Sequence, residues 1–110
     1  MFWDDNSDQA QAFSKVQNEE PHESSFTHEL IAGAAAFEAQ KAYMDFKEKN
    51  GAPQDHETAK ELLAGFAGAA ADKLFETKGL DFLDREKAKY EAKRQVQDGE
   101  SALPSLSSSR

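Results

Sequence analysis

Two segments of the chain repeat each other at an offset of 32 residues. Residues 29–33 read Glu-Leu-Ile-Ala-Gly and align with residues 61–65, which read Glu-Leu-Leu-Ala-Gly. Further pairs at the same offset are Ala35/Ala67, Ala39/Ala71, Lys41/Lys73 and Tyr43/Phe75. Each copy holds a segment that is apolar almost all the way round a helix, residues 30–37 and residues 62–71. Because such a helix must be covered on several sides, the repeat predicts two central core helices.

The segment between the two copies is short and predicts an antiparallel hairpin. Residues 50–53 read Asn-Gly-Ala-Pro. Their glycine suits a left-handed position just past a helix, and their proline cannot continue one. The first core helix is expected to begin with a cap at Ser25 or Thr27 and to reach about Lys49.

The second core helix has marked ends as well. It is expected to begin between residues 55 and 58, where Thr58 and Glu61 have the spacing of a capping box. It is expected to end at Lys78, because Gly79 follows as a helix terminator. Both ends of the hairpin's second half are therefore predicted from local signals alone.

Composition makes the fold all-α. Valine, isoleucine and threonine together number only six of 110 residues, too few for a sheet core, whereas 18 alanines favour helices. Weaker helical patterns flank the hairpin at residues 4–17 and at residues 81–98. We predict a small helical bundle that forms a single domain over residues 1–98. Residues 99–110 are Ser-rich and contain a proline, so a disordered tail is expected there.

Charge is unevenly distributed along the chain, which carries a net charge of -8. Residues 1–20 are acidic and residues 85–94 are basic, so the two segments are expected to attract each other within one chain or between two. The last helix is expected to begin with Asp81 as its cap and Asp84 three residues on. Two ion pairs at i, i+4 spacing are predicted, Asp81/Arg85 and Arg94/Asp98.

No motif of enzyme or cofactor chemistry is present in the sequence. There is no cysteine, no Gly-rich phosphate loop, no Gly-x-Ser-x-Gly and no EF-hand loop. The three histidines, His22, His28 and His56, include no pair at the i, i+4 spacing of a metal-binding helix. We therefore predict no catalytic residues, no cofactor and no metal site, and expect the protein not to be an enzyme.

Several partners and locations are disfavoured by the same sequence. The net negative charge opposes binding to nucleic acid. The longest apolar run, residues 62–71, is about half the length of a membrane-spanning helix, so no stable membrane insertion is expected. The acidic start lacks the basic and apolar regions of a targeting peptide. These features predict a cytoplasmic location.

The sequence resembles the CipC-like family of small fungal proteins, named for a concanamycin-induced antibiotic-response protein. Four segments carry the resemblance: residues 27–38, 60–68, 76–82 and 84–89. It extends loosely to the start around Trp3 and covers roughly residues 1–98. The resemblance implies a cytoplasmic, stress-inducible fungal protein whose biochemical activity is undefined, and it supplies no catalytic residues.

Small residues in the core helices predict self-association, most simply as a dimer, or binding of a protein partner. Gly33, Gly65, Ala35 and Ala67 permit close approach of helix backbones. A four-helix monomer would have to cover two apolar helices with two weakly apolar ones, and a dimer would relieve that shortage. Substituting either alanine by leucine is accordingly expected to disrupt assembly by overpacking.

The alternative function is a carrier of an apolar small molecule or lipid. Phe37, Phe66 and Phe75 lie among alanines in the core helices, where they fill ordinary core or line a cavity between helices. Among the histidines, His28 is the best candidate for a ligand or interface residue, because it lies beside Glu29 near the start of the first core helix, where a neutral imidazole or a cap contact is expected. His56 is expected at the opposite end of the hairpin, so the two histidines should not share a site.

Overall fold

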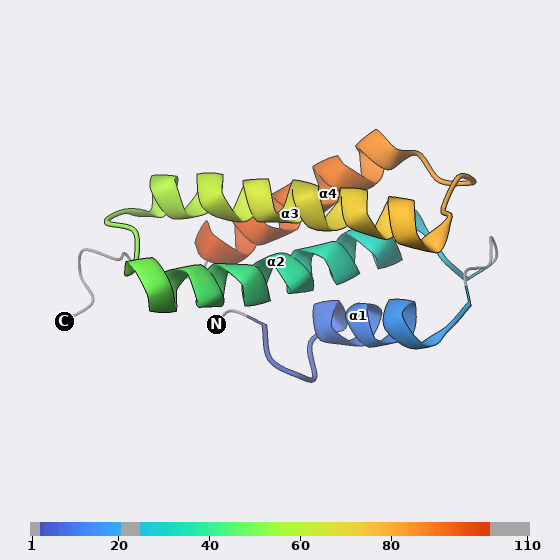
Figure 1. The fold of residues 1–110 in the computed structure, drawn as a ribbon, viewed down its shortest axis with the longest axis horizontal. Coiled ribbons are helices and arrows are strands. Elements are labelled where there is room, and N and C mark those ends of the chain that lie inside the picture. Colours follow the sequence, from blue (N-terminus) through green and yellow to red (C-terminus); the bar gives the residue numbers. More distant parts are fainter. Residues whose placement is uncertain (1–2, 21–24, 102–110) are drawn as a thin grey trace.

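The computed structural model describes residues 3–20 and 25–101, which form α-helices and no strand. The helices are α1 (Asp8–Asn18), α2 (His28–Asn50), α3 (His56–Lys78) and α4 (Arg85–Ser101). The long helices α2 and α3 form the predicted antiparallel hairpin (Figure 1). Helix α1 lies along α2 on the side away from α3, and α4 contacts both α2 and α3. The all-α bundle predicted from the sequence is confirmed.

Local caps set the ends of the hairpin helices. Thr27 caps α2 by accepting a hydrogen bond from the Leu30 N–H, as predicted. At the end of α2, Gly51 has φ 83 and ψ 161, a positive-φ conformation that differs from the predicted left-handed one. Gly79 after α3 is left-handed, with φ 65 and ψ 54. Both positions favour glycine because it has no Cβ.

The predicted capping box at the start of α3 is wrong. Asp55 is the cap, and its side chain accepts the Thr58 N–H at 2.8 Å. Thr58 therefore lies inside the first turn rather than before it. An aspartate side chain three residues ahead of Thr58 already accepts this N–H, so the helix begins three residues earlier than a Thr58 cap would require.

The flanking helices also differ from their predicted bounds. Helix α1 begins at Asp8 behind a Ser7 cap, so residues 4–7 form a turn instead of its first turn. Helix α4 begins at Arg85, because Asp84 rather than Asp81 accepts the Lys87 N–H. It continues through Ser101, so residues 99–101, predicted as disordered, are helical. The rest of the predicted tail, residues 102–110, lies outside the described residues.

The core lies where the flanking helices meet the hairpin. Helix α4 contributes a narrow stripe of fully buried Ala88, Ala92 and Val96. On α1, Ala12 lies so close to α2 that a Cβ built on Gly33 would be 3.2 Å from the Ala12 Cβ. Because small side chains let helix axes approach closely, two weakly apolar helices do cover α2 and α3. The shortage of covering surface expected from the sequence is therefore smaller than predicted.

No helix of the described residues is long and apolar enough to cross a membrane.

Candidate functional site

One side of α3 remains exposed between its contacts with α2 and α4. Glu61, Gly65, Ala69 and Lys73 follow one another at intervals of four residues, and all four are exposed. Residues at this spacing form one inclined ridge along a helix. A Cβ built on Gly65 would meet nothing within 4 Å, so the middle of the ridge is open. We call these four residues the α3 ridge.

A shallow apolar groove runs beside the α3 ridge, towards α2. It has a volume of about 160 Å³ and is lined by Glu38, Ala42, Phe66, Ala69, Ala70 and Lys73. The Phe66 ring is half-buried and contacts the Phe46 ring edge-on, with 6.2 Å between centroids. The Lys73 ammonium reaches across the groove to within 3.8 Å of a Glu38 carboxylate oxygen. The α3 ridge and this groove together make up what we call the open face.

The small residues predicted for an interface lie in different environments. Ala35 and Ala67 are fully buried inside this chain, and Gly33 is buried beneath α1. Gly65 alone among these four residues is exposed. A leucine at Ala35 or Ala67 would therefore clash inside the folded chain, so its first effect would be on folding rather than on assembly.

The predicted phenylalanines also lie apart from one another. Phe37 is half-buried against Phe13 of α1, with 5.5 Å between ring centroids. Phe75 is buried, and the Arg85 guanidinium lies 5.8 Å from the centre of its ring. Phe66 borders the groove beside α2. The three rings occupy separate contacts and do not line one common cavity.

His28 connects the start of α2 to the start of α4. Its Nε2 accepts the Asp84 N–H at 2.8 Å, which assigns the neutral ring's proton to Nδ1. A hollow of about 280 Å³ lies beside it, lined also by Thr27, Glu29, Lys87 and Glu91. His28 lies at the start of α2, as predicted. Its side chain is hydrogen-bonded to the backbone of Asp84, the residue before α4.

A buried acid at the other end of the bundle was missed by sequence reasoning. Glu100 of α4 is 1% exposed, and its Oε2 lies 2.6 Å from Nδ1 of His56 at the start of α3. Burial, together with the Glu100 charge, raises the pKa of Tyr43 in α2 to about 12. The spacing of Ala88, Ala92, Val96 and Glu100 at intervals of four could have identified it, because it places Glu100 on the buried stripe.

This cluster ties helix ends together and has no composition suited to a metal. The described residues contain no group of three or more His, Cys, Asp and Glu side chains placed to hold an ion. His56 and His28 lie at opposite ends of α2, as predicted, so they share no site. Pairing with His56 compensates a buried carboxylate that would be costly alone.

Ion pairs of the basic helix α4 are made with α3 and within α4. Arg85 binds Asp72 at 2.9 Å and Glu76 at 3.0 Å, so the predicted pair with Asp81 is wrong. Lys89 also binds Asp72, at 3.2 Å. The predicted Arg94/Asp98 pair is confirmed at 3.1 Å. Over the residues placed by the structure, no ion pair joins the acidic residues 4–8 to α4.

The carboxyl group of Asp72 responds to these contacts. Desolvation raises its pKa, but hydrogen bonds from Lys89 and Arg85, together with their positive charges, outweigh that effect and lower the pKa below its usual value. The carboxylate thus stays ionised and holds α4 against α3 through two cations.

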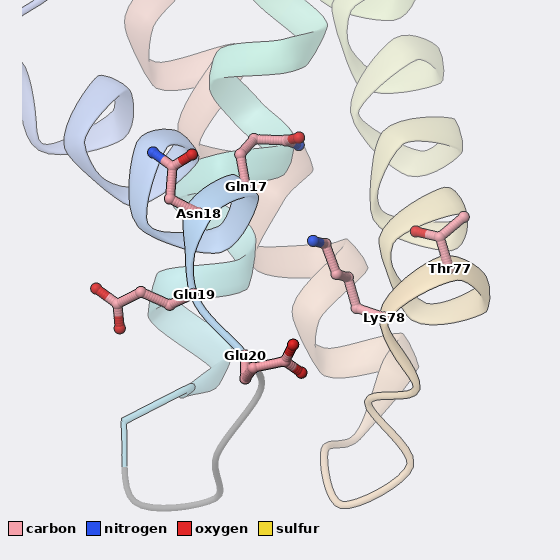
Figure 2. Close-up of a pocket in the computed structure, with 6 residues that line it drawn as sticks. All are labelled: Gln17, Asn18, Glu19, Glu20, Thr77 and Lys78. Atoms are coloured by element: carbon pink, nitrogen blue, oxygen red, sulfur yellow. The ribbon is translucent and has the colours of Figure 1, made fainter.

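A polar hollow of about 320 Å³ lies between the ends of α1 and α3. Figure 2 shows its lining, in which Lys78 extends from the end of α3 towards the end of α1. The other lining residues are all exposed: Gln17, Asn18, Glu19, Glu20 and Thr77. Exposed polar side chains without a buried polar group make a solvated crevice, not a preorganised binding site.

Comparison with known proteins places the chain in a family. A family described as Virulence factor CipC-like matches residues 12–102, which include all of α2, α3 and α4 and most of α1. No curated protein and no solved structure matches the chain. The matched segment covers most of the 110 residues and agrees with the resemblance noted from the sequence. The chain belongs to the CipC-like family.

Proposed function

We propose that the protein is not an enzyme and acts by protein–protein association, self-association in the first place, through the open face. The observation that supports this is the exposed α3 ridge beside an apolar groove. In a chain of net charge -8, this surface combines small residues, a half-buried aromatic ring and three charged side chains, Glu38, Glu61 and Lys73. An aromatic ring and apolar surface rimmed by polar side chains are typical of a contact surface for another protein.

Burial of Phe66 provides the favourable energy of such a contact. The ring is half-buried in the isolated chain, so a partner that covers its exposed part removes apolar area from water. Gly65 has no side chain and Ala69 has only a methyl group, so the backbone of a partner can come close to α3 beside the ring. The other predicted interface residues, Ala35, Ala67 and Gly33, are buried inside the folded chain.

A size measurement in native extract tests this proposal. The full chain, tagged and expressed in its own cells, is expected to elute well above its monomer mass of 12.2 kDa. Gly65→Glu places a charge on the open face without a clash and improves helix propensity, so it should shift the protein to monomer while keeping it folded.

Gln11→Glu is the matched control, because it adds the same charge on the exposed side of α1. It should leave the elution volume unchanged. The proposal fails if the unsubstituted chain elutes as a monomer, or if Gly65→Glu and Gln11→Glu elute alike at the larger size.

The carrier hypothesis from the sequence has less support from the geometry. The phenylalanine rings pair in separate places, Phe13 with Phe37 and Phe46 with Phe66, rather than around one enclosed space. Extraction of the natively purified protein with organic solvent would release a stoichiometric small molecule if the protein were a carrier. We expect no such release.

Family membership supports a biological setting for the proposal. The resemblance implies a cytoplasmic, stress-responsive fungal protein, and the acidic chain without a membrane-spanning helix in its described residues is compatible with that setting. Fluorescent tagging should show the protein in the cytoplasm, at a level that rises on antibiotic stress. An unchanged level under such stress would contradict this part of the proposal.

A further inference from the structure

We infer that the occupant of the open face is a second copy of this chain, with the α3 helices of the two copies packed antiparallel about a two-fold axis between Gly65 and Ala69. This inference rests on the proposed function and names its partner and register. In this arrangement Glu61 of each copy lies opposite Lys73 of the other.

The shape of the α3 ridge fits this packing. Its two inner residues, Gly65 and Ala69, are the smallest side chains available, and no atom lies within 4 Å of a Cβ built on Gly65. Interdigitation of rows with a spacing of four residues is the commonest class of helix packing in globular proteins. Two copies of a ridge with a small centre can therefore bring their helix axes close together.

The charges at the ends of the ridge select the antiparallel direction. Glu61 forms no ion pair with the residues that the structure describes. Lys73 is 69% exposed and only 3.8 Å from Glu38, a long contact that leaves its ammonium accessible. A two-fold axis pairs Glu61 with Lys73 at both ends of the contact, whereas a parallel arrangement would oppose like charges.

Net charge adds to the selection of this face. Two chains that each carry -8 repel each other, so a contact is opposed least where a base offsets nearby acids. The α3 ridge has one acid and one base, and the groove beside it adds a second acid, Glu38, on the far side of Lys73. The half-buried ring of Phe66 flanks the axis on each copy, so the same contact covers the part of both rings that is still exposed.

Charge reversal on the purified full chain tests the pairing. Glu61→Lys and Lys73→Glu each replace two attractive pairs by two repulsive ones. We expect each to weaken self-association about tenfold or more at low salt. The double variant restores opposite charges and should associate like the original chain. An equimolar mixture of the two single variants should form the mixed dimer in preference to either homodimer.

Glu48→Lys is the control, an exposed charge reversal on α2 away from the groove lining. It should leave the dissociation constant from sedimentation equilibrium unchanged. The inference is overturned if the single variants at Glu61 and Lys73 associate as tightly as the original chain, or if the double variant remains weakened.

Cysteine cross-linking tests the register independently. The chain has no cysteine, so single substitutions give clean probes. A mixture of Gly65→Cys and Ala69→Cys should form a disulfide-linked dimer faster than either variant alone, because the axis brings residue 65 of one copy next to residue 69 of the other. Faster cross-linking of Gly65→Cys with itself would refute the proposed axis.

Failure of this inference is distinguishable from failure of the proposed function. A purified chain that stays monomeric at micromolar concentration, while its extract complex still depends on Gly65, would overturn the second-copy inference and leave protein–protein association standing. Monomers in both preparations would overturn both.

Discussion

The two copies of the repeat fold into helices of equal length, 23 residues each, with different neighbours. In α2, Gly33 is buried against Ala12 of α1. In α3, the equivalent Gly65 faces open space. The central alanines, Ala35 and Ala67, are fully buried in both copies. One sequence element thus builds a shared core, while the placement of α1 decides which copy keeps an exposed surface.

Equivalent polar positions in the two copies show the same divergence. Gln40 of α2 is 3% exposed and makes two hydrogen bonds with the Trp3 backbone, accepting its N–H and donating to its C=O. Asp72, the equivalent residue of α3, has a side chain that is 38% exposed and binds Arg85 and Lys89. Each copy therefore uses this position to hold its flanking segment, by a buried amide in α2 and by a surface ion-pair network in α3.

The largest expected effect concerns the buried alanines that the copies share. Ala35→Leu and Ala67→Leu insert three carbon atoms into a fully packed site and should each reduce the free energy of unfolding by about 3 kcal/mol. Urea denaturation of both variants measures this. Ala52→Leu in the exposed turn is the control and should be nearly neutral. A neutral result at Ala35 or Ala67 would show that the core is looser than the structure indicates.

The second expected effect separates the two flanking contacts. Gln40→Ala deletes two hydrogen bonds in a buried site and should lower the free energy of unfolding by about 2 kcal/mol. Asp72→Ala removes partly exposed ion pairs and should cost less. Thermal unfolding of both variants orders the two losses. A larger loss for Asp72→Ala than for Gln40→Ala would contradict the difference between a buried amide in α2 and a surface ion-pair network in α3.

The third expected effect compares the same glycine-to-alanine substitution at the equivalent position of each copy, made in separate variants. Gly65→Ala should raise the free energy of unfolding of the isolated chain by about 1 kcal/mol, because alanine favours a helix and meets no neighbour. Gly33→Ala brings a Cβ within 3.2 Å of Ala12, so strain should cancel most of that gain. Equal stabilisation by the two variants in urea would contradict the close packing of α1.

The smallest expected effect is an acid dependence specific to α3. Because the folded-state pKa of Asp72 is lowered, its stabilising contribution is present above the pKa of the unfolded chain and is lost as the pH falls through the folded value. Below about pH 4, Asp72→Asn should therefore lose less stability than the original chain does. Parallel pH profiles of unfolding for the two proteins would contradict this.

Most of the hairpin was predictable because its signals are local. Thr27 and Gly79 end helices through contacts within one turn, and the apolar segments identify the core without knowledge of any partner. The sequence predicts that the fourth helix ends at residue 98, because Gly99 and the Ser-rich residues after it favour a tail. A buried Glu100 becomes favourable only through His56, which lies 44 residues away in the sequence.

The candidate site was only partly predictable for a similar reason. The repeat marks Gly33 and Gly65 equally, and Ala35 and Ala67 equally, as places for close helix contact. Which of these positions is covered depends on where α1 docks, and its short apolar stripe does not distinguish the two copies. Glu61 and Lys73 can be recognised as the two ends of one exposed ridge only when the faces of α3 that α2 and α4 cover are known. The sequence therefore does not predict them as interface residues.

The most direct test of self-association is native mass spectrometry of the full chain, purified gently from its own cells. One spectrum reports the number of chains and any retained small molecule. We expect a species of two chains, twice 12.2 kDa, with no additional mass. A single chain that carries a discrete extra mass would contradict self-association and favour the carrier hypothesis instead.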